Sequence, residues 1–190
     1  MILKDRIIVA LDVDRLYEAE RLVEILTPYV GYFKVGLQLI TKEGAPQVVR
    51  RIQSLGGKVF FDGKFDDIPN TTEQASKAVV SLGVKMFNVH ASSGRDAVAA
   101  AARVKETSIL LGVTVLTSHT KESCESIFGA TPNEKVRSFA KMLLEEGADG
   151  IICSPREAEM LKSDKAFSEL KTVCPGIRPK WAQKNDQSGI

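Results

Sequence analysis

Aspartate and lysine alternate in one short segment of the chain, Asp62-Gly63-Lys64-Phe65-Asp66-Asp67. Asp62 and Lys64 are two positions apart, and in an extended backbone this spacing places both side chains on the same face. Carboxylate and ammonium groups this close hold one another charged when they are partly removed from water. The cluster therefore suits an anionic substrate and a reaction that moves negative charge, with a lysine that can donate a proton.

Further polar residues follow other apolar runs of the sequence. Lys34 ends one such run, Asp12 directly follows another, and His90 and Thr117 come after two later ones. Any of these could be an ordinary solvated residue, because Asp and Lys are mostly exposed in proteins. Their position favours a shared site, because the carboxyl ends of parallel strands converge on one mouth of a barrel.

The elements that must position these residues follow from the hydrophobic pattern. Continuous apolar runs are typical of strands buried on both faces, and apolar residues at helical spacing are typical of helices packed on a sheet. Strands are predicted at residues 7–11, 32–36, 58–62, 84–90, 109–116, 150–154 and 171–174. Helices are predicted at residues 16–26, 38–55, 71–82, 97–104 and 131–146, and again from Ser154 onward.

Strands that alternate with helices in this way form a parallel sheet with right-handed crossovers. A doubly wound open sheet and a (β/α)8 barrel both have this pattern. The open sheet has a glycine-rich phosphate loop after its first strand, whereas this chain has Leu11-Asp12-Val13-Asp14 there. We therefore predict an α/β fold, a (β/α)8 TIM barrel with about seven βα units present, as a single domain over residues 1–190.

The composition argues against several classes of protein. The 190 residues include 26 Lys+Arg and 24 Asp+Glu, for a formal net charge of +2, and 44% are hydrophobic. No block of like charge builds the basic stripe of a nucleic-acid-binding protein. No apolar run approaches the ~20 residues of a membrane-spanning helix. Residues 1–6 carry charges where a signal peptide has its apolar stretch. We expect a cytoplasmic protein without a nucleic-acid or membrane partner.

Cysteine and histidine usage predicts neither a disulfide framework nor a metal site. Cys124, Cys153 and Cys174 are widely spaced and include no CxxC pair, so we interpret them as small buried apolar residues. His90 and His119 are not spaced as metal ligands. We therefore expect no cofactor and no metal.

The segment 62–71, which reads Asp-x-Lys-x-x-Asp-Ile-Pro-Asn-Thr, carries a family resemblance. The chain resembles the orotidine 5′-phosphate decarboxylase family in its bacterial form, over essentially its whole length. A related group of sugar-phosphate synthases and decarboxylases shares the DxKxxD pattern but not the segments around it. The other matching segments are Val9-Ala10-Leu11-Asp12, Phe33-Lys34-Val35-Gly36, Asn88-Val89-His90-Ala91, Val115-Leu116-Thr117-Ser118, Pro175-Gly176-Ile177-Arg178-Pro179 and Asn185-Asp186-Gln187.

The resemblance implies decarboxylation of orotidine 5′-monophosphate to UMP and CO2 without a cofactor. Lys64 would donate the proton to C6 of the pyrimidine, and Asp62 would lie beside the substrate carboxylate. Lys34 and Asp67 would complete the charge network, with Asp67 contributed across a homodimer interface. The resemblance also implies further substrate contacts: Asp12 and Lys34 at the ribose, Ile68 and Thr71 from the partner subunit, Thr117 (or its neighbour Ser118) at the pyrimidine, Gln187 between base and phosphate, and Arg178 nearby.

The sequence departs from the family pattern in three places. Asp66 stands where the family often has His, and Gly63 where it usually has a larger apolar residue. The third departure follows Ser188, where the family usually has Arg and this sequence has Gly189-Ile190. The segments of the family that follow, an eighth strand, a Gly-Arg phosphate-binding turn and a last helix, are not in the sequence. Because a barrel typically needs about 250 residues, we expect the domain to be C-terminally incomplete.

Two alternatives to an active decarboxylase remain open at this point. One is a truncated, inactive nucleotide-binding remnant, because an incomplete barrel would leave unpaired strand edges. The other is a sugar-phosphate synthase or decarboxylase of the related DxKxxD group.

Overall fold

The computed structural model describes residues 3–178, in which strands and helices alternate as predicted. The strands are β1 (Ile8–Ala10), β2 (Tyr32–Gly36), β3 (Val59–Phe65), β4 (Met86–His90), β5 (Ile109–Val113), β6 (Gly150–Ile152) and β7 (Lys171–Val173). The α-helices are α1 (Leu16–Leu26), α2 (Leu37–Glu43), α3 (Ala45–Ser54), α4 (Pro69–Ser81), α5 (Arg95–Arg103), α6 (Lys121–Phe128), α7 (Pro132–Glu145) and α8 (Pro155–Lys162). Short 3-10 turns cover Leu3–Arg6, Ala91–Ser93 and Lys165–Phe167.

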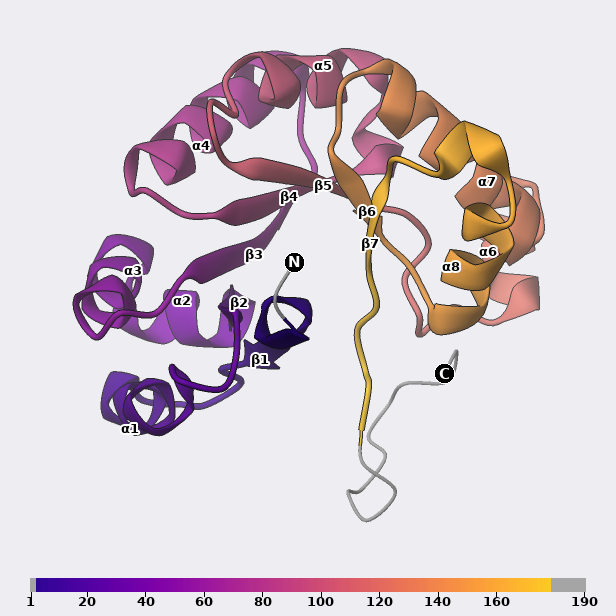
Figure 1. Ribbon diagram of the computed structural model, residues 1–190. Coiled ribbons are helices and arrows are strands. Elements are labelled where there is room, and N and C mark those ends of the chain that lie inside the picture. The colour runs from indigo at the N-terminus through magenta and orange to yellow at the C-terminus, as the bar shows by residue number, and fades with distance from the viewer. Residues whose placement is uncertain (1–2, 179–190) are drawn as a thin grey trace.

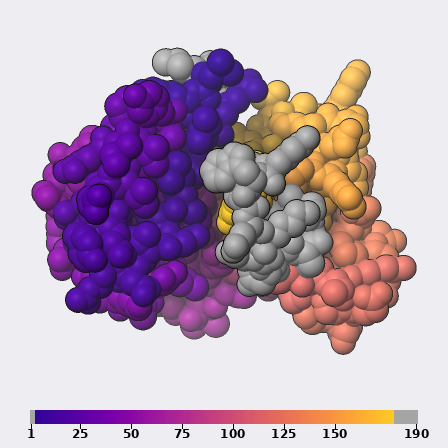
Figure 2. Space-filling view, turned by 90° about the horizontal axis from the view of Figure 1, so that it is seen from below, coloured from indigo at the N-terminus to yellow at the C-terminus, as the bar shows by residue number. Residues whose placement is uncertain are grey.

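The strands form one 7-stranded sheet in the order β1-β2-β3-β4-β5-β6-β7, and every neighbouring pair is parallel. A doubly wound sheet reverses its strand order at a switch point, so this uninterrupted order excludes it. The sheet curls, and the helices follow its outer side (Figure 1). Seen from below, the indigo N-terminal part of the chain and the yellow C-terminal part lie on opposite sides of this face (Figure 2). Within the described residues the sheet has the curvature and strand order of the predicted barrel type.

Both faces of the sheet are apolar, which explains the continuous apolar runs of the sequence. The inner face carries a cluster of Phe60, Met86 and Leu111, with Ile8, Tyr32, Ile109, Ile152 and Val173 packed against it. The outer face packs against the helices through a larger cluster that includes Phe33, Val35, Phe61, Phe87, Leu110 and Ile151. Because side chains alternate along a strand, each of the strands β1 to β6 supplies residues to both clusters.

Several helix ends follow their local signals. Helix α7 begins with a capping box between Thr131 and Glu134, as the Thr-Pro-Asn-Glu segment predicts. The predicted helix at residues 38–55 is instead two helices, because Gly44 adopts a φ of 83° between α2 and α3. Helix α6, which the periodicity did not predict, is capped at its N-terminus by Thr120, whose side chain accepts a hydrogen bond from the backbone N–H of Ser123 at 3.2 Å. No helix among residues 3–178 is long and apolar enough to cross a membrane.

Only β2 has the predicted bounds, and the other strands begin or end at different residues. Two of these differences concern the mouth of the barrel. Strand β5 ends at Val113 rather than at residue 116, so Thr117 lies in the loop that follows. Strand β3 continues to Phe65 rather than ending at Asp62, with an irregular register against β4 between Phe61 and Phe65. Because of this extension, Lys64 lies within β3 rather than in the loop that follows it.

Candidate active site

A layer of polar side chains lies directly above the apolar inner face of the sheet. Two residues beyond inner-face Tyr32, Phe60 and Met86, the same strands carry Lys34, Asp62 and Asn88. Residues two apart on a strand share a face, so these polar groups point to the inside of the curled sheet at the carboxyl end of their strands. This is the end at which barrel enzymes place their active sites.

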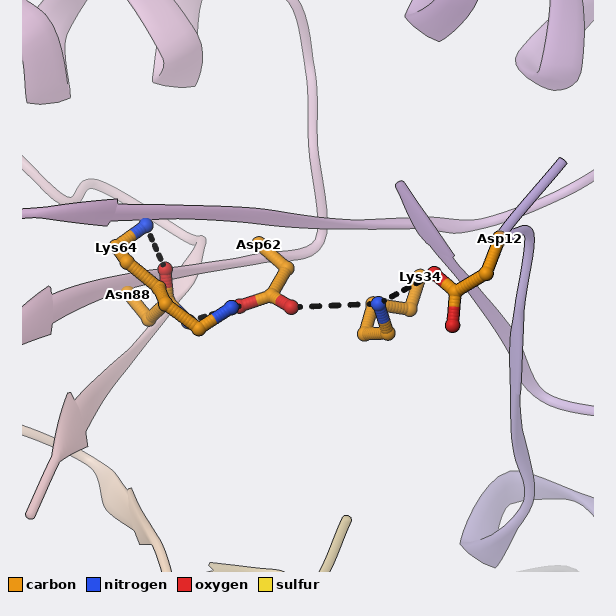
Figure 3. Close-up of polar contacts among 5 residues, drawn as sticks. All are labelled: Asp12, Lys34, Asp62, Lys64 and Asn88. Carbon is orange, nitrogen blue, oxygen red and sulfur yellow. Dashed lines mark hydrogen bonds and ion pairs between the residues drawn. The ribbon is translucent and has the colours of Figure 1, made fainter. Parts of the chain in front are cut away.

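Four charged groups in this layer form a continuous chain of ion pairs (Figure 3). Asp12 Oδ1 lies 3.0 Å from Lys34 Nζ, and Lys34 Nζ lies 3.3 Å from Asp62 Oδ2. The other oxygen of that carboxylate, Asp62 Oδ1, accepts a hydrogen bond from Lys64 Nζ at 2.8 Å. The structure therefore brings together four of the residues predicted for the site, with carboxylate and ammonium groups in alternation.

Among the four charged groups of this chain of ion pairs, Asp62 is the most buried. Its side chain is 9% exposed, whereas those of Lys34 and Lys64 are 23% and 32% exposed and that of Asp12 is 56% exposed. Burial raises the pKa of the Asp62 carboxyl, but the charge and hydrogen bond of Lys64, the charge of Lys34 and the hydrogen bond from Asn88 together hold it below its ordinary value. Asp62 is therefore a buried carboxylate that stays ionised, and both lysines that pair with it are more exposed than it is.

Asn88 is a further residue of this site that the sequence analysis did not single out. Its side chain is fully buried. Its amide Nδ2 donates a hydrogen bond to Asp62 Oδ1 at 2.7 Å, and its Oδ1 accepts one from the backbone N–H of Lys64, also at 2.7 Å. A polar residue within an apolar strand was the available signal, because a buried amide must find hydrogen-bond partners.

The backbone at Lys64 differs from the regular strand that the spacing suggested. Lys64 has a φ of +50°, a conformation that residues other than glycine rarely adopt, and it lies in the irregular part of β3. Such a conformation costs about 1–3 kcal/mol and persists where surrounding contacts enforce it. The hydrogen bond from the Lys64 N–H to Asn88 is such a contact, so one amide side chain holds both the lysine backbone and the carboxylate that its ammonium meets.

The residues after Lys64 lie on an exposed loop that leads into α4. Asp67 accepts a hydrogen bond from the Ile68 N–H at 2.7 Å through Oδ1, and its carbonyl accepts one from the Thr72 hydroxyl at 3.0 Å. Ile68 is 66% exposed, and Thr71 is also exposed in the first turn of the helix. No ion pair joins Asp67 to either lysine of the site within residues 3–178. Within the described residues, Asp67 is therefore not part of the chain of ion pairs from Asp12 to Lys64.

The remaining predicted site residues lie on later loops. Thr117 is half-buried after β5, and Arg178 is exposed after β7, where its Nη1 donates a hydrogen bond to the carbonyl of Ile177 at 3.1 Å. Gln187 lies outside the described residues. His90 ends β4, and burial lowers the pKa of its ring, with the charge of Lys64 acting in the same direction. Among residues 3–178, no three His, Cys, Asp or Glu side chains are grouped as metal ligands would be.

The sequence that forms this site is similar to those of known proteins. Residues 5–190 match the sequence profile of the Orotidine 5′-phosphate decarboxylase / HUMPS family. The chain belongs to this family. An orotidine 5′-phosphate decarboxylase from Moorella thermoacetica is 43% identical, in an alignment that covers 98% of this chain and 78% of that protein. One from Syntrophomonas wolfei is 42% identical and is aligned over 98% of this chain and 82% of its own length.

Solved structures agree with this assignment to the Orotidine 5′-phosphate decarboxylase / HUMPS family. The crystal structure of orotidine 5′-phosphate decarboxylase from Lactobacillus acidophilus superimposes with a TM-score of 0.79 at 35% identity, covering 91% of this chain and 81% of that one. An uncharacterized conserved protein from Geobacillus kaustophilus gives the same TM-score at 33% identity. The family resemblance and the barrel-type fold predicted from the sequence are both confirmed.

The contacts of Asn88 predict the effect of removing its side chain. In Asn88→Ala the part-buried Lys64 N–H loses its acceptor and the buried Asp62 carboxylate loses a donor, so we expect the free energy of unfolding to fall by about 2–4 kcal/mol. Urea denaturation of both proteins measures this difference. Ser92→Ala is the matched control, because the Ser92 hydroxyl makes an exposed 3.2 Å hydrogen bond to Asp66. Equal stability of Asn88→Ala and Ser92→Ala would contradict the role given to Asn88.

The lowered pKa of Asp62 predicts how the site titrates. Folding favours the ionised carboxylate, so its contribution to stability is present above the unfolded-state pKa and is lost as the pH falls through the lowered folded-state pKa. We expect the Asp62 pKa to lie below the ordinary carboxyl value and to rise in Lys64→Ala. In that variant, the burial that raises this pKa is opposed by one positive charge fewer. Carboxyl 13C NMR of aspartate-labelled protein measures both values. An Asp62 pKa that is identical in the two proteins would refute this account of the site.

Proposed function

We propose that this protein decarboxylates orotidine 5′-monophosphate to UMP and CO2 in pyrimidine biosynthesis, with Lys64 as the proton donor. The observation that carries the proposal is the buried Asp62 carboxylate with Lys64 Nζ at 2.8 Å and Lys34 Nζ at 3.3 Å, at the mouth of a barrel-type sheet. Membership of the Orotidine 5′-phosphate decarboxylase / HUMPS family supports it. So do the relatives from M. thermoacetica and S. wolfei, which are named orotidine 5′-phosphate decarboxylase.

The chemistry of the reaction explains why a lysine is needed at this position. Loss of CO2 from C6 of the pyrimidine leaves an electron pair on a ring carbon. An ammonium group held beside that carbon stabilises the developing charge and then supplies the proton that completes UMP. Lys64 is suited to this role because its ammonium is already oriented by Asp62 and its backbone is fixed by Asn88. Little reorganisation is then required when the charge develops.

Asp62 has two roles in this proposal. It holds the Lys64 ammonium in place, and it stands beside the substrate carboxylate, where two negative charges disfavour the bound substrate relative to the state in which CO2 has left. The second role requires a carboxylate that stays ionised, and the lowered pKa of Asp62 satisfies this requirement.

Substrate contacts remote from C6 supply binding energy for the reaction in this proposal. Asp12 and Lys34, 3.0 Å apart at the end of the charged chain, would contact the ribose. Thr117 would contact the pyrimidine, and Arg178 and Gln187 would bind near the phosphate. Interactions at such remote groups can be used to stabilise the transition state at the reacting carbon.

We further propose that the protein acts as a cytoplasmic homodimer in which residues 1–190 belong to one domain. Asp67, Ile68 and Thr71 are exposed on the loop and first turn of α4, and the 66% exposure of Ile68 leaves a large apolar side chain for a partner to cover. Each of the three would enter the site of the other subunit, where Asp67 would extend the charged chain beyond Lys64.

The proposed activity predicts the behaviour of a lysine variant. The wild-type protein is expected to lower the absorbance of orotidine 5′-monophosphate as UMP forms, and Lys64→Ala to lower kcat by at least about a hundredfold, the usual scale for a lost general acid. Lys77→Ala is the control, because Lys77 is an exposed lysine paired with Glu73 on α4. Equal rates for wild type and Lys64→Ala would overturn the role of Lys64. Turnover of hexulose or keto-acid sugar phosphates in place of orotidine 5′-monophosphate would indicate the related DxKxxD group instead.

The proposed dimer predicts that two inactive variants restore activity when they are combined. In a mixed dimer of Lys64→Ala and Asp67→Asn chains, one site holds both substitutions and the other holds neither. Random reassociation after unfolding and refolding together is therefore expected to restore about a quarter of wild-type sites. Decarboxylation by the mixture and by each variant alone measures the effect. If the mixture is no more active than the separate variants, Asp67 does not act across an interface.

A further inference from the structure

Two cysteines that are far apart in the sequence lie side by side in the fold. Cys153 directly follows β6 and Cys174 directly follows β7, and the preceding residues, Ile152 and Val173, are Cα partners in the parallel register. The backbone N–H of Cys153 donates to the carbonyl of Val173 at 3.2 Å, so the ladder continues to this position. Neighbouring strands lie about 4.8 Å apart, which is within the range of Cα separations that disulfides span.

The two side chains point to the same side of the sheet. Ile152 and Val173 pack with the inner cluster, so the next residue on each strand faces the helices, and Cys153 is part of the outer cluster with 1% exposure. The Cys174 side chain is half-buried and is more accessible. A hydrogen bond from the Cys153 thiol lowers the pKa of Cys174 to about 7, while the same contact and burial raise the pKa of Cys153.

We propose that Cys153 and Cys174 form a redox-active dithiol that small-molecule disulfides, such as oxidised glutathione, convert into an intramolecular disulfide. This inference does not depend on the proposed decarboxylase activity, because the thiols lie on the helix-facing side of the sheet and the charged chain lies on its inner side. Cys174 is the attacking thiol, because it is the more exposed of the two and the one that ionises more readily.

The reaction proceeds in two exchange steps. The Cys174 thiolate attacks one sulfur of oxidised glutathione, which forms a mixed disulfide and expels one glutathione thiolate. The Cys153 thiol then gives up its proton, and its sulfur attacks the Cys174 sulfur, which forms the protein disulfide and expels the second glutathione thiolate. Both protons from the protein thiols end on the glutathione thiols, and the two electrons lost by the protein reduce the glutathione disulfide.

The position of the pair gives the disulfide a structural consequence. Cys174 directly precedes Pro175-Gly176-Ile177-Arg178, the segment that carries a proposed ligand contact. Within the described residues β7 is held on one side only, by β6. A covalent bond between the ends of these two strands would therefore fix the start of the segment that leads to Arg178, and it would also raise the melting temperature of the protein.

The proposal can be tested with the reduced wild-type protein and oxidised glutathione under native conditions. Remaining thiols are alkylated after unfolding, and intact mass and peptide mapping count and locate them. We expect two of the three thiols to be lost, no glutathione to remain attached, a cross-link between the peptides of Cys153 and Cys174, and a melting temperature that a dithiol reductant returns to its starting value. Retention of all three thiols, or a product that stops at a glutathione adduct, would overturn the proposal.

Serine variants assign the order of the two steps. Cys153→Ser should accumulate the glutathione adduct on Cys174, whereas Cys174→Ser should lose little thiol because Cys153 is buried. Cys124→Ser is the matched control and should form the disulfide as the wild type does, because Cys124 is fully buried and burial raises the pKa of its thiol. Thiol loss in Cys174→Ser at the wild-type rate would contradict the assignment of Cys174 as the attacking thiol. None of these measurements depends on turnover. A protein that fails to decarboxylate orotidine 5′-monophosphate could therefore still confirm or contradict the proposed disulfide.

Discussion

The site depends on keeping one buried carboxylate, that of Asp62, ionised next to the apolar inner face of the sheet. An unpaired buried charge is costly, and removing one partner of a buried pair typically costs about 3–5 kcal/mol. Asp62 meets this constraint with three partners: the ammonium groups of Lys34 and Lys64 and the amide of Asn88. Each partner comes from a strand, two from the neighbours of β3 and one from β3 itself. The sheet therefore determines the geometry of the charged groups.

The layering of the inner face makes this arrangement possible. Tyr32, Phe60 and Met86 belong to the apolar cluster of the inner face, and two positions further along the same strands the side chains become polar. Strand alternation alone would place Lys64 on the same face as Asp62 with an ordinary strand backbone. The structure instead places Lys64 in the irregular part of β3 with a positive φ, and its N–H is satisfied by Asn88 rather than by a regular ladder. The site therefore contains a local departure from regular sheet structure, as functional sites often do.

The sequence was sufficient to predict those features that depend on short-range patterns. The apolar runs predicted the order of the strands, the residues of helix α1 were predicted directly, and the spacing of Asp62 and Lys64 predicted their contact. Features that depend on register between strands were not predicted. Asn88 is part of an apolar run and reads as a strand residue until β3 and β4 are aligned. In the sequence Cys153 and Cys174 are widely separated, and only the register between β6 and β7 shows that they are neighbours. The break between helices α2 and α3 at Gly44 was not predicted either, because the helical periodicity of residues 38–55 continues across it.

The rigidity of Asp62 bears directly on the proposed chemistry. A second carboxylate brought next to Asp62 would ordinarily be accommodated by movement of one group or by uptake of a proton. Movement is opposed because Asp62 Oδ1 is held by Lys64 and Asn88 while Oδ2 faces Lys34. Protonation is opposed because the two lysines lower the pKa of Asp62. In the proposed reaction, the repulsion between the two carboxylates is instead removed when the substrate carboxylate leaves as CO2. The negative charge then passes to a carbon that faces Lys64. The same contacts that stabilise a buried carboxylate in the free protein would then make the bound substrate unfavourable relative to its decarboxylated product.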